Sequence, residues 1–145
     1  GNSAGGHLAA WVSNIMEDGS KPYFSILIYG AMTRNEYHNS YNANKIMFGH
    51  NVYPAQVDSA STQDLVGPTT PPALMFLSDD DDIVRPVVST SYYKALKRHG
   101  VKASMHIYPS GGHGWSGRMN WEYRQQWLDA IKDWLSTLEE ENNKK

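Results

Sequence analysis

An α/β fold of parallel strands with flanking helices is the architecture that the sequence predicts. Three short apolar runs rich in β-forming residues lie between Gly or Pro boundaries, at 23–29, 73–77 and 103–108. Continuous apolar runs of this kind are typical of parallel strands buried on both faces. A segment with helical periodicity separates the last two runs, and this strand–helix–strand order indicates a parallel βαβ unit.

Three segments carry apolar residues at helical spacing. The first, 6–16, precedes the first strand. The second, 86–99, connects the last two strands and is followed by Gly100, a residue that favours a helix C-terminus. The third, 120–138, has one apolar stripe that can pack across the sheet. The stripe consists of Trp127, Ile131, Trp134, Leu135 and Leu138.

Residues 1–138 are predicted to belong to one domain, followed by a solvated tail at 139–145. The stretch 31–70 has no clear strand pattern and only a weak helical pattern at 43–48. Long irregular segments within compact domains are usually functional. We therefore expect 31–70 to form a cap or insertion over the functional site.

Composition excludes several classes of protein. A net charge of −2, with Lys and Arg scattered along the chain, argues against a nucleic-acid partner. No apolar run approaches the roughly 20 residues that a membrane-spanning helix needs, so no membrane segment is expected. The absence of cysteine excludes disulfides and thiolate metal sites, but it leaves cytoplasmic, periplasmic and secreted locations open.

The chain opens with a G-x-S-x-G pattern at Gly1 to Gly5. At a tight turn between a strand and a helix, this pattern exposes the hydroxyl of a strained serine, and the two glycines remove side-chain collisions. Ser3 is therefore a candidate nucleophile. The alternative is a helix N-cap, which serine also favours. A cap does not need Gly1 and Gly5, so the nucleophile is the favoured interpretation.

Candidate acid and base residues follow the second and third strands. Asp79–Asp82 come after the second strand, and His113 lies in the glycine-rich run 111–115 after the third. The carboxyl ends of parallel strands share one edge of a sheet, so a carboxylate there can orient a histidine. The alternatives are a solvated acidic loop or metal site for the aspartates, and an ordinary surface position for His113. The metal alternative is poor because the Gly and distal Glu of an EF-hand loop are missing.

Three further residues are candidates for contact with a substrate. Tyr29 and Trp115 lie beside the predicted strand ends, and His38 lies in the predicted cap. Ordinary packing is the alternative for the two aromatic residues.

In combination, these motifs resemble one family: the carbohydrate-associated branch of the α/β-hydrolase esterases, which includes bacterial acetyl-xylan-esterase-like enzymes. The resemblance covers nearly the whole chain. It rests on the elbow at 1–8, the stretch 70–81, the segment 84–89 and the run 106–115. Ser, acid and His also occur in the chain order of this superfamily. The implied fold is the C-terminal part of an α/β-hydrolase.

The resemblance also implies the roles of the site residues. Ser3 is the expected nucleophile, His113 the general base, and the backbone N–H of Ala4 one donor of the oxyanion hole. No metal or organic cofactor is expected for this chemistry.

The register of the acid depends on a D-x-x-V-P pattern. In the family, the acid lies three residues before the valine, and Val84 therefore selects Asp81. Arg85 stands where the family usually has proline, which leaves Asp82 as the alternative acid.

The fold of this family begins with several strands before the elbow, including a loop, commonly His-Gly-Gly-Gly, that donates to the oxyanion. We therefore expect the chain to be the C-terminal half of an enzyme. The missing N-terminal half, or a partner chain, would complete the sheet. Without it, the strand at 23–29 would have an open edge.

The expected reaction is hydrolysis of a carboxylic ester through an acyl-enzyme, with an acetyl group on a carbohydrate such as xylan as substrate. One alternative is a serine peptidase of the prolyl-oligopeptidase type, which shares the fold and the order of the three residues. The other is a non-catalytic fragment or binding module that lacks the rest of the oxyanion hole.

Overall fold

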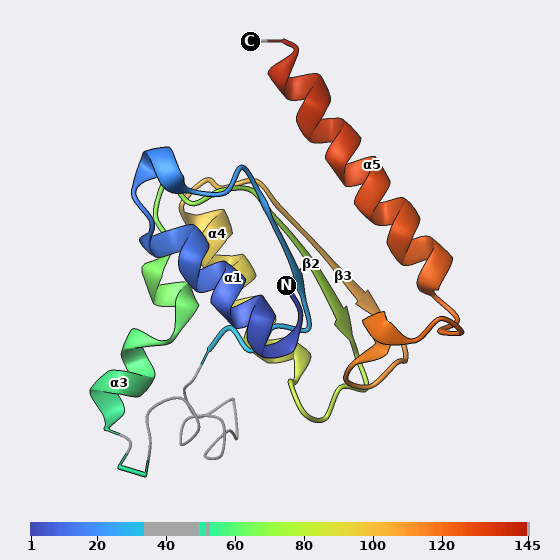
Figure 1. The fold of residues 1–145 in the computed structure, drawn as a ribbon, viewed down its shortest axis with the longest axis horizontal. Helices are drawn as coiled ribbons and strands as arrows, with labels where there is room; N and C mark the ends of the chain where they lie inside the picture. The colour runs from blue at the N-terminus through green and yellow to red at the C-terminus, as the bar shows by residue number, and fades with distance from the viewer. Residues whose placement is uncertain (34–49, 52, 145) are drawn as a thin grey trace.

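The computed structural model describes residues 1–33, 50–51 and 53–144. Within these residues the sheet contains three parallel strands, in the order β1-β2-β3 (Figure 1). The strands are β1 (Ser25–Ile28), β2 (Ala73–Ser78) and β3 (Ala103–Tyr108). The central strand, β2, is buried along its whole length. The predicted parallel α/β architecture is confirmed.

Helices cover both faces of this sheet (Figure 1). α1 (Ser3–Ile15) and α4 (Pro86–Arg98) lie on one face, and α5 (Arg124–Asn142) lies on the other. α4 connects β2 to β3 and is the predicted crossover helix. The shorter elements are η1 (Asp18–Ser20), α3 (Pro54–Ser59), η2 (Thr62–Leu65) and η3 (Trp115–Gly117).

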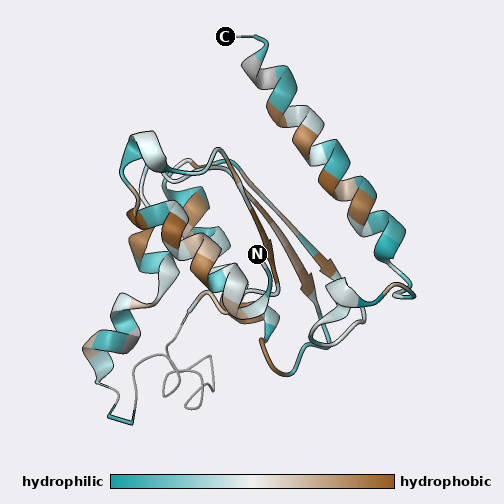
Figure 2. Ribbon diagram, in the orientation of Figure 1, coloured by the Kyte–Doolittle hydropathy of each residue, from teal (hydrophilic) through white to brown (hydrophobic). Residues whose placement is uncertain are grey.

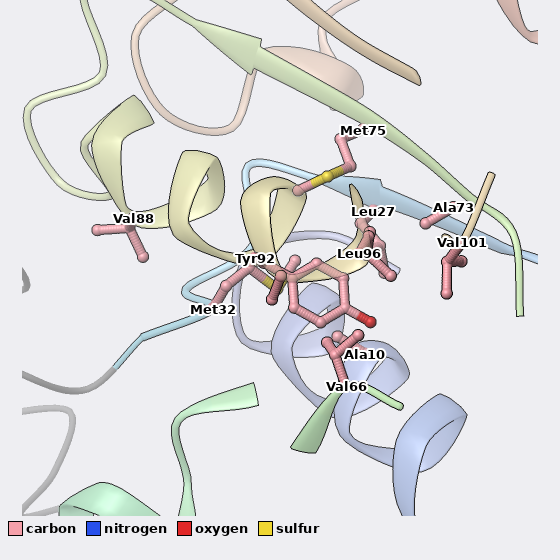
Figure 3. Close-up of a cluster of buried hydrophobic side chains, with 11 residues drawn as sticks. Ala10, Leu27, Met32, Val66, Ala73, Met75, Val88, Tyr92, Leu96 and Val101 are labelled. Atoms are coloured by element: carbon pink, nitrogen blue, oxygen red, sulfur yellow. The ribbon is translucent and has the colours of Figure 1, made fainter. Parts of the chain in front are cut away.

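The core beneath α1 and α4 includes the side chain of Tyr92 (Figure 3). Tyr92 of α4 is fully buried, and its hydroxyl accepts a hydrogen bond of 3.1 Å from the side-chain amide of Asn14. Burial raises the pKa of Tyr92 to about 12. Asn14 also accepts a 2.7 Å hydrogen bond from Thr70, so α1, α4 and the segment before β2 are joined in one network.

The core beneath α5 is aromatic. Successive residues of a strand point to opposite faces, so Leu74 and Phe76 contact this core while Ala73 and Met75 contact the other. Bands of apolar and polar residues alternate along α5 (Figure 2), as expected for a helix with one buried face. The predicted stripe is confirmed. Its buried members are Trp127, Trp134 and Leu138, with Ile131 and Leu135 packed beside them.

Several predicted element boundaries differ from the observed ones. α1 begins at Ser3, three residues before the predicted start, and β1 is confined to Ser25–Ile28. α5 begins at Arg124, four residues after the predicted start, because Trp121 stacks on Trp115 and lies outside the helix. α5 also continues to Asn142, so most of the predicted tail is helical.

The edge of β1 is partly paired by the start of the chain. The amino group of Gly1 donates to the carbonyl of Ile26 at 2.8 Å, and the N–H of Ile28 donates to the carbonyl of Gly1 at 2.9 Å. Asn2 forms a parallel bridge with Ile28. The predicted open edge of this strand is therefore wrong at its carboxyl end, where the residues before Ser3 occupy it.

The predicted cap at 31–70 is described only in part. Its described residues include α3 and η2, and η2 contacts both α1 and α4. The ring of His7 on α1 bonds the carbonyl of Ala60 at 2.6 Å, in a buried position. The inner part of this segment thus contributes to the core, while the weak helical pattern at 43–48 lies outside the described residues.

The described residues offer neither a membrane-crossing helix nor a cluster of metal ligands. No helix among them is both long enough and apolar enough to cross a membrane. No group of three or more His, Cys, Asp or Glu side chains in the same part of the chain is arranged to hold a metal ion.

Truncation of the buried face of α4 tests this packing. Leu96 is 0% exposed, so Leu96→Ala is expected to lower the free energy of unfolding by about 2–5 kcal/mol through lost burial and a residual cavity. Val87 lies on the same helix but is 43% exposed. As the matched control, Val87→Ala is expected to change stability by less than about 0.5 kcal/mol in urea unfolding. Equal effects of the two substitutions would contradict the assignment of the buried face.

Candidate active site

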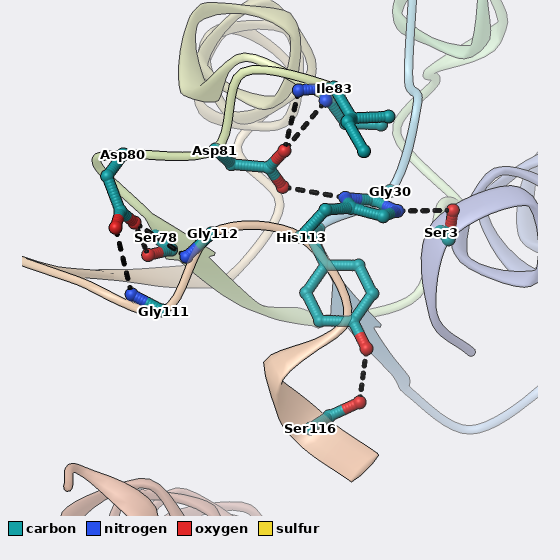
Figure 4. Close-up of polar contacts among 12 residues, drawn as sticks. Ser3, Gly30, Ser78, Asp80, Asp81, Ile83, Gly111, Gly112, His113 and Ser116 are labelled. Atoms are coloured by element: carbon teal, nitrogen blue, oxygen red, sulfur yellow. Dashed lines mark hydrogen bonds and ion pairs between the residues drawn. The ribbon is translucent and has the colours of Figure 1, made fainter. Parts of the chain in front are cut away.

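Three side chains from separate elements meet at the carboxyl edge of the sheet (Figure 4). Ser3 stands at the start of α1, Asp81 follows β2, and His113 follows β3. The hydroxyl oxygen of Ser3 lies 2.8 Å from Nε2 of His113, and Nδ1 of His113 lies 2.8 Å from Oδ2 of Asp81. The structure therefore brings together the three residues that the sequence predicts as nucleophile, base and acid.

Ser3 has a left-handed backbone conformation, with φ of 48°. Such angles are unfavourable for residues with a side chain, and strain of this kind is typical of functional turns. A Cβ atom on Gly1 would collide with the carbonyl of Gly5, so the first glycine of the pattern is required. A Cβ atom on Gly5 would meet only Asn2 Oδ1 at 3.8 Å, so the predicted collision at Gly5 is not present among the described residues.

A different glycine of the elbow allows α1 to approach the sheet. A Cβ atom on Gly6 would lie 2.9 Å from the Cα of Gly30, the residue two positions after β1. Backbone therefore packs directly on backbone where the helix carrying Ser3 meets the end of β1.

Asp81 is held rigidly beside the histidine. Its side chain is 1% exposed, and Oδ1 accepts hydrogen bonds from the backbone N–H groups of Ile83 at 3.0 Å and Val84 at 2.8 Å. Oδ2 remains for His113. Asp82, the alternative acid, has an exposed side chain, and the structure places Asp81 rather than Asp82 at the imidazole.

The carboxylate determines the form of the imidazole. An ionised carboxylate only accepts hydrogen bonds, so the proton of a neutral His113 resides on Nδ1. Nε2 is then the acceptor for the hydroxyl of Ser3. The geometry suits proton transfer from serine to histidine as the serine oxygen attacks an electrophile.

The loop that carries His113 has unusual backbone angles, as its glycines predict. Gly111, Gly112 and Gly114 have φ values of 147°, 58° and 79°. A Cβ atom on Gly111 would lie 2.8 Å from the indole nitrogen of Trp121, so a larger residue there would displace the loop from the aromatic core.

Tyr29 packs against the ring of His113, and Trp115 packs against Tyr29. Contact of either ring with substrate stays a prediction. Trp115 is 0% exposed and stacks on Trp121, with ring centroids 3.9 Å apart. Tyr29 is 2% exposed, lies 4.8 Å from the ring of His113, and bonds the hydroxyl of Ser116. Full burial among aromatic neighbours leaves both rings as supports for the loop.

The remaining predicted site residues have different outcomes. His38 lies outside the described residues. Ala4 is exposed at the first turn of α1, where backbone N–H groups have no partner within the helix. Its N–H directly follows Ser3 in the chain, and its role as an oxyanion donor stays a prediction.

Two residues near the site were missed by sequence reasoning. Asp80 accepts hydrogen bonds from the loop of His113, and Arg118 donates to carbonyls of the same loop. The Ser78 hydroxyl, and then the N–H of Gly112, hold the pKa of Asp80 below its usual value. Four consecutive aspartates give no signal that distinguishes these functions, and an exposed arginine gives none either.

The sheet order, the helices on both faces and the Ser–His–Asp cluster at the carboxyl edge define an α/β-hydrolase. Residues 1–140 match the profile of the Prolyl oligopeptidase family, and the chain belongs to that family. The predicted superfamily is thereby confirmed.

Individual relatives carry the names of esterases and sugar hydrolases. The chain is 36% identical over 144 residues to an acetylxylan esterase from Xylanibacter ruminicola, with 95% of this chain and 30% of the relative covered. It is similar to the crystal structure of an acetyl ester-xyloside bifunctional hydrolase from Caldicellulosiruptor lactoaceticus, with a TM-score of 0.88 and 28% identity. That match covers 95% of this chain and 55% of the other.

A second solved structure is also similar to the chain over about half of its own length. A sugar hydrolase from Lactococcus lactis matches with a TM-score of 0.77 and 26% identity, over 97% of this chain and 58% of that one. The chain thus spans about half the length of the solved relatives and less than a third of the acetylxylan esterase.

Exchange of Ser3 tests the strain at the turn. Ser3→Gly and Ser3→Ala both remove the hydroxyl, but only glycine adopts a φ of 48° without a clash of Cβ. The glycine variant is expected to be more stable by about 1 kcal/mol in urea unfolding. At Ser91, inside α4, the order should reverse, because glycine costs about 1 kcal/mol relative to alanine in a helix. The same order at both positions would argue against strain at Ser3.

Proposed function

We propose that the protein is a serine esterase that hydrolyses carboxylic esters, with acetyl groups on a carbohydrate such as xylan as its substrates. The observation that carries this proposal is the continuous series of hydrogen bonds from Ser3 through His113 to Asp81. The acetylxylan esterase relative supports the ester substrate, and the acetyl ester-xyloside hydrolase supports the carbohydrate.

The reaction has two halves. In the first, the hydroxyl oxygen of Ser3 attacks the ester carbonyl, and Nε2 of His113 takes its proton. Asp81 stabilises the imidazolium that forms. When the tetrahedral intermediate collapses, the bond to the alcohol breaks, and His113 protonates the leaving oxygen. In the second half, His113 takes a proton from water, the water oxygen attacks the acyl-serine, and Ser3 regains its proton as the acid departs.

The oxyanion of each intermediate needs hydrogen-bond donors. The N–H of Ala4 supplies one, at the N-terminal end of α1, where the helix dipole also favours negative charge. Loss of a donor of this kind typically costs about 10²–10³ in rate. We propose that a second donor comes from a further segment of the same fold or from a partner chain, because the relatives are about twice as long or longer.

The match to the Prolyl oligopeptidase family favours peptide-bond hydrolysis as the second candidate reaction. A peptidase of the prolyl-oligopeptidase type would use the same three side chains on an amide bond. The two reactions differ in the leaving group, an alcohol or an amine, and turnover of matched substrates separates them.

Covalent labelling tests the nucleophile. A fluorophosphonate probe is expected to label the wild-type protein at Ser3 and to leave Ser3→Ala unlabelled, since the probe reacts with an activated serine. The matched control is Ser91→Ala, which should label like the wild type because Ser91 lies in α4 away from the site. Folded wild-type protein that does not label would contradict the proposed role. Faster turnover of an amide than of the corresponding acetyl ester would favour the peptidase function over the esterase function.

Neighbouring aspartates allow a sharp test of the acid. Asp81→Asn keeps the shape of the side chain, but it no longer fixes the proton on Nδ1 of His113, so kcat is expected to fall by about 10⁴-fold. Asp82→Asn changes an exposed carboxylate one residue away and should leave kcat within about twofold, as for surface substitutions. A large loss in Asp82→Asn with little loss in Asp81→Asn would assign the acid to residue 82.

A further inference from the structure

A second aspartate contacts the loop of His113 from the side of β2. Oδ1 of Asp80 accepts a 2.7 Å hydrogen bond from the N–H of Gly112, and Oδ2 accepts one of 3.2 Å from the N–H of Gly111 (Figure 4). The hydroxyl of Ser78, the buried last residue of β2, donates to Oδ1 of the same carboxylate. The carboxylate thus joins the end of the central strand to the backbone of the loop.

Arg118 contacts the carbonyl groups of the same loop. Nη1 donates to the carbonyl of Gly111, and Nη2 donates to the carbonyl of His113, both at 3.0 Å. A guanidinium presents its donors in a fixed planar fork, so two carbonyls bound to one fork are fixed relative to each other. Asp80 and Arg118 therefore constrain both the N–H and the carbonyl groups of the loop.

A loop of this composition needs such constraints. Glycine has access to more backbone conformations than any other residue, and 111, 112 and 114 are all glycines with positive φ. Rotation of the peptide groups around His113 would swing the imidazole away from its two partners. Asp80 remains an ionised acceptor well below neutral pH, because the Ser78 hydroxyl and the N–H of Gly112 lower its pKa.

We propose that Asp80 and Arg118 are positioning residues that hold His113 between Ser3 and Asp81, a role that rests on the proposed esterase function. Neither residue bonds the imidazole or the serine hydroxyl. Both act through the backbone on either side of His113, and they set the direction in which its side chain leaves the loop.

The test compares Asp80→Ala and Arg118→Ala with Asp79→Ala in the full-length enzyme. Asp79 is the neighbouring exposed aspartate, and its side chain is outside this set of hydrogen bonds. Two quantities are measured for labelling by a fluorophosphonate: the rate constant and the fraction of protein labelled at completion. Steady-state kcat and KM for p-nitrophenyl acetate are measured on the same samples.

Loss of positioning is expected to lower the labelling rate constant and kcat by on the order of 10²-fold, the cost of a misplacement of about 1 Å. The labelled fraction should stay complete, KM should change little, and Asp79→Ala should behave like the wild type. A purely structural role predicts the reverse, a smaller labelled fraction with an unchanged rate constant for each labelled site.

Conservative variants keep the test decisive if an alanine variant does not fold. Asp80→Asn retains one acceptor oxygen and Arg118→Lys retains one charged donor, so each should show a smaller loss of the same kind. The double alanine variant should lose less than the product of the single losses, because both side chains constrain one loop.

The failures of the two proposals are distinguishable. If wild-type enzyme shows no labelling that depends on Ser3, the esterase function itself is wrong. If the wild type labels at Ser3 and Asp80→Ala labels at the same rate with the same kcat, the positioning role alone is wrong.

Discussion

The parallel pairing of β2 with both of its neighbours is the constraint on which the site depends. The register sets Ile28 beside Phe76 and Ser78 beside Tyr108, so the strands end in adjacent rows at one edge of the sheet. Asp81 leaves the sheet only three residues after β2, and Ser3 reaches the same edge because Gly1 pairs with β1. Side chains that are far apart in sequence meet there.

The same edge also concentrates backbone strain. Among the described residues, Ser3 and Tyr29 are the non-glycine residues with positive φ, and both adjoin His113. Hydrogen bonds to the sheet fix both conformations. Gly1, two residues before Ser3, is bonded to β1, and the N–H of Tyr29 donates to the carbonyl of Phe76 at 2.8 Å. Strained backbone conformations persist only where several surrounding contacts hold them in place, and the hydrogen bonds to the sheet are such contacts here.

The sequence predicts well those features that depend on local pattern. Apolar runs and helical spacing located the strands and α4, and Gly100 marked the end of that helix with a φ of 72°. The start of α5 could not be predicted in this way, because the stacking of Trp121 on Trp115 in the aromatic core is a tertiary contact that overrides helical periodicity. The same contact buries Trp115, which local pattern does not distinguish from a ring that lines a pocket.

The three side chains of the proposed site differ in how they are anchored. Ser3 begins a helix and Asp81 is bonded to the turn that leads into α4, whereas His113 lies five residues beyond β3 in a glycine-rich loop. Ordering such a loop costs more conformational entropy than ordering the other two positions. Stacking of Trp115 against the core fixes where the loop lies, but stacked rings leave the orientation of its peptide groups undetermined. Directional hydrogen bonds are needed for that. Asp80 binds the N–H of Gly112 before the histidine, and Arg118 binds the carbonyl of His113 itself.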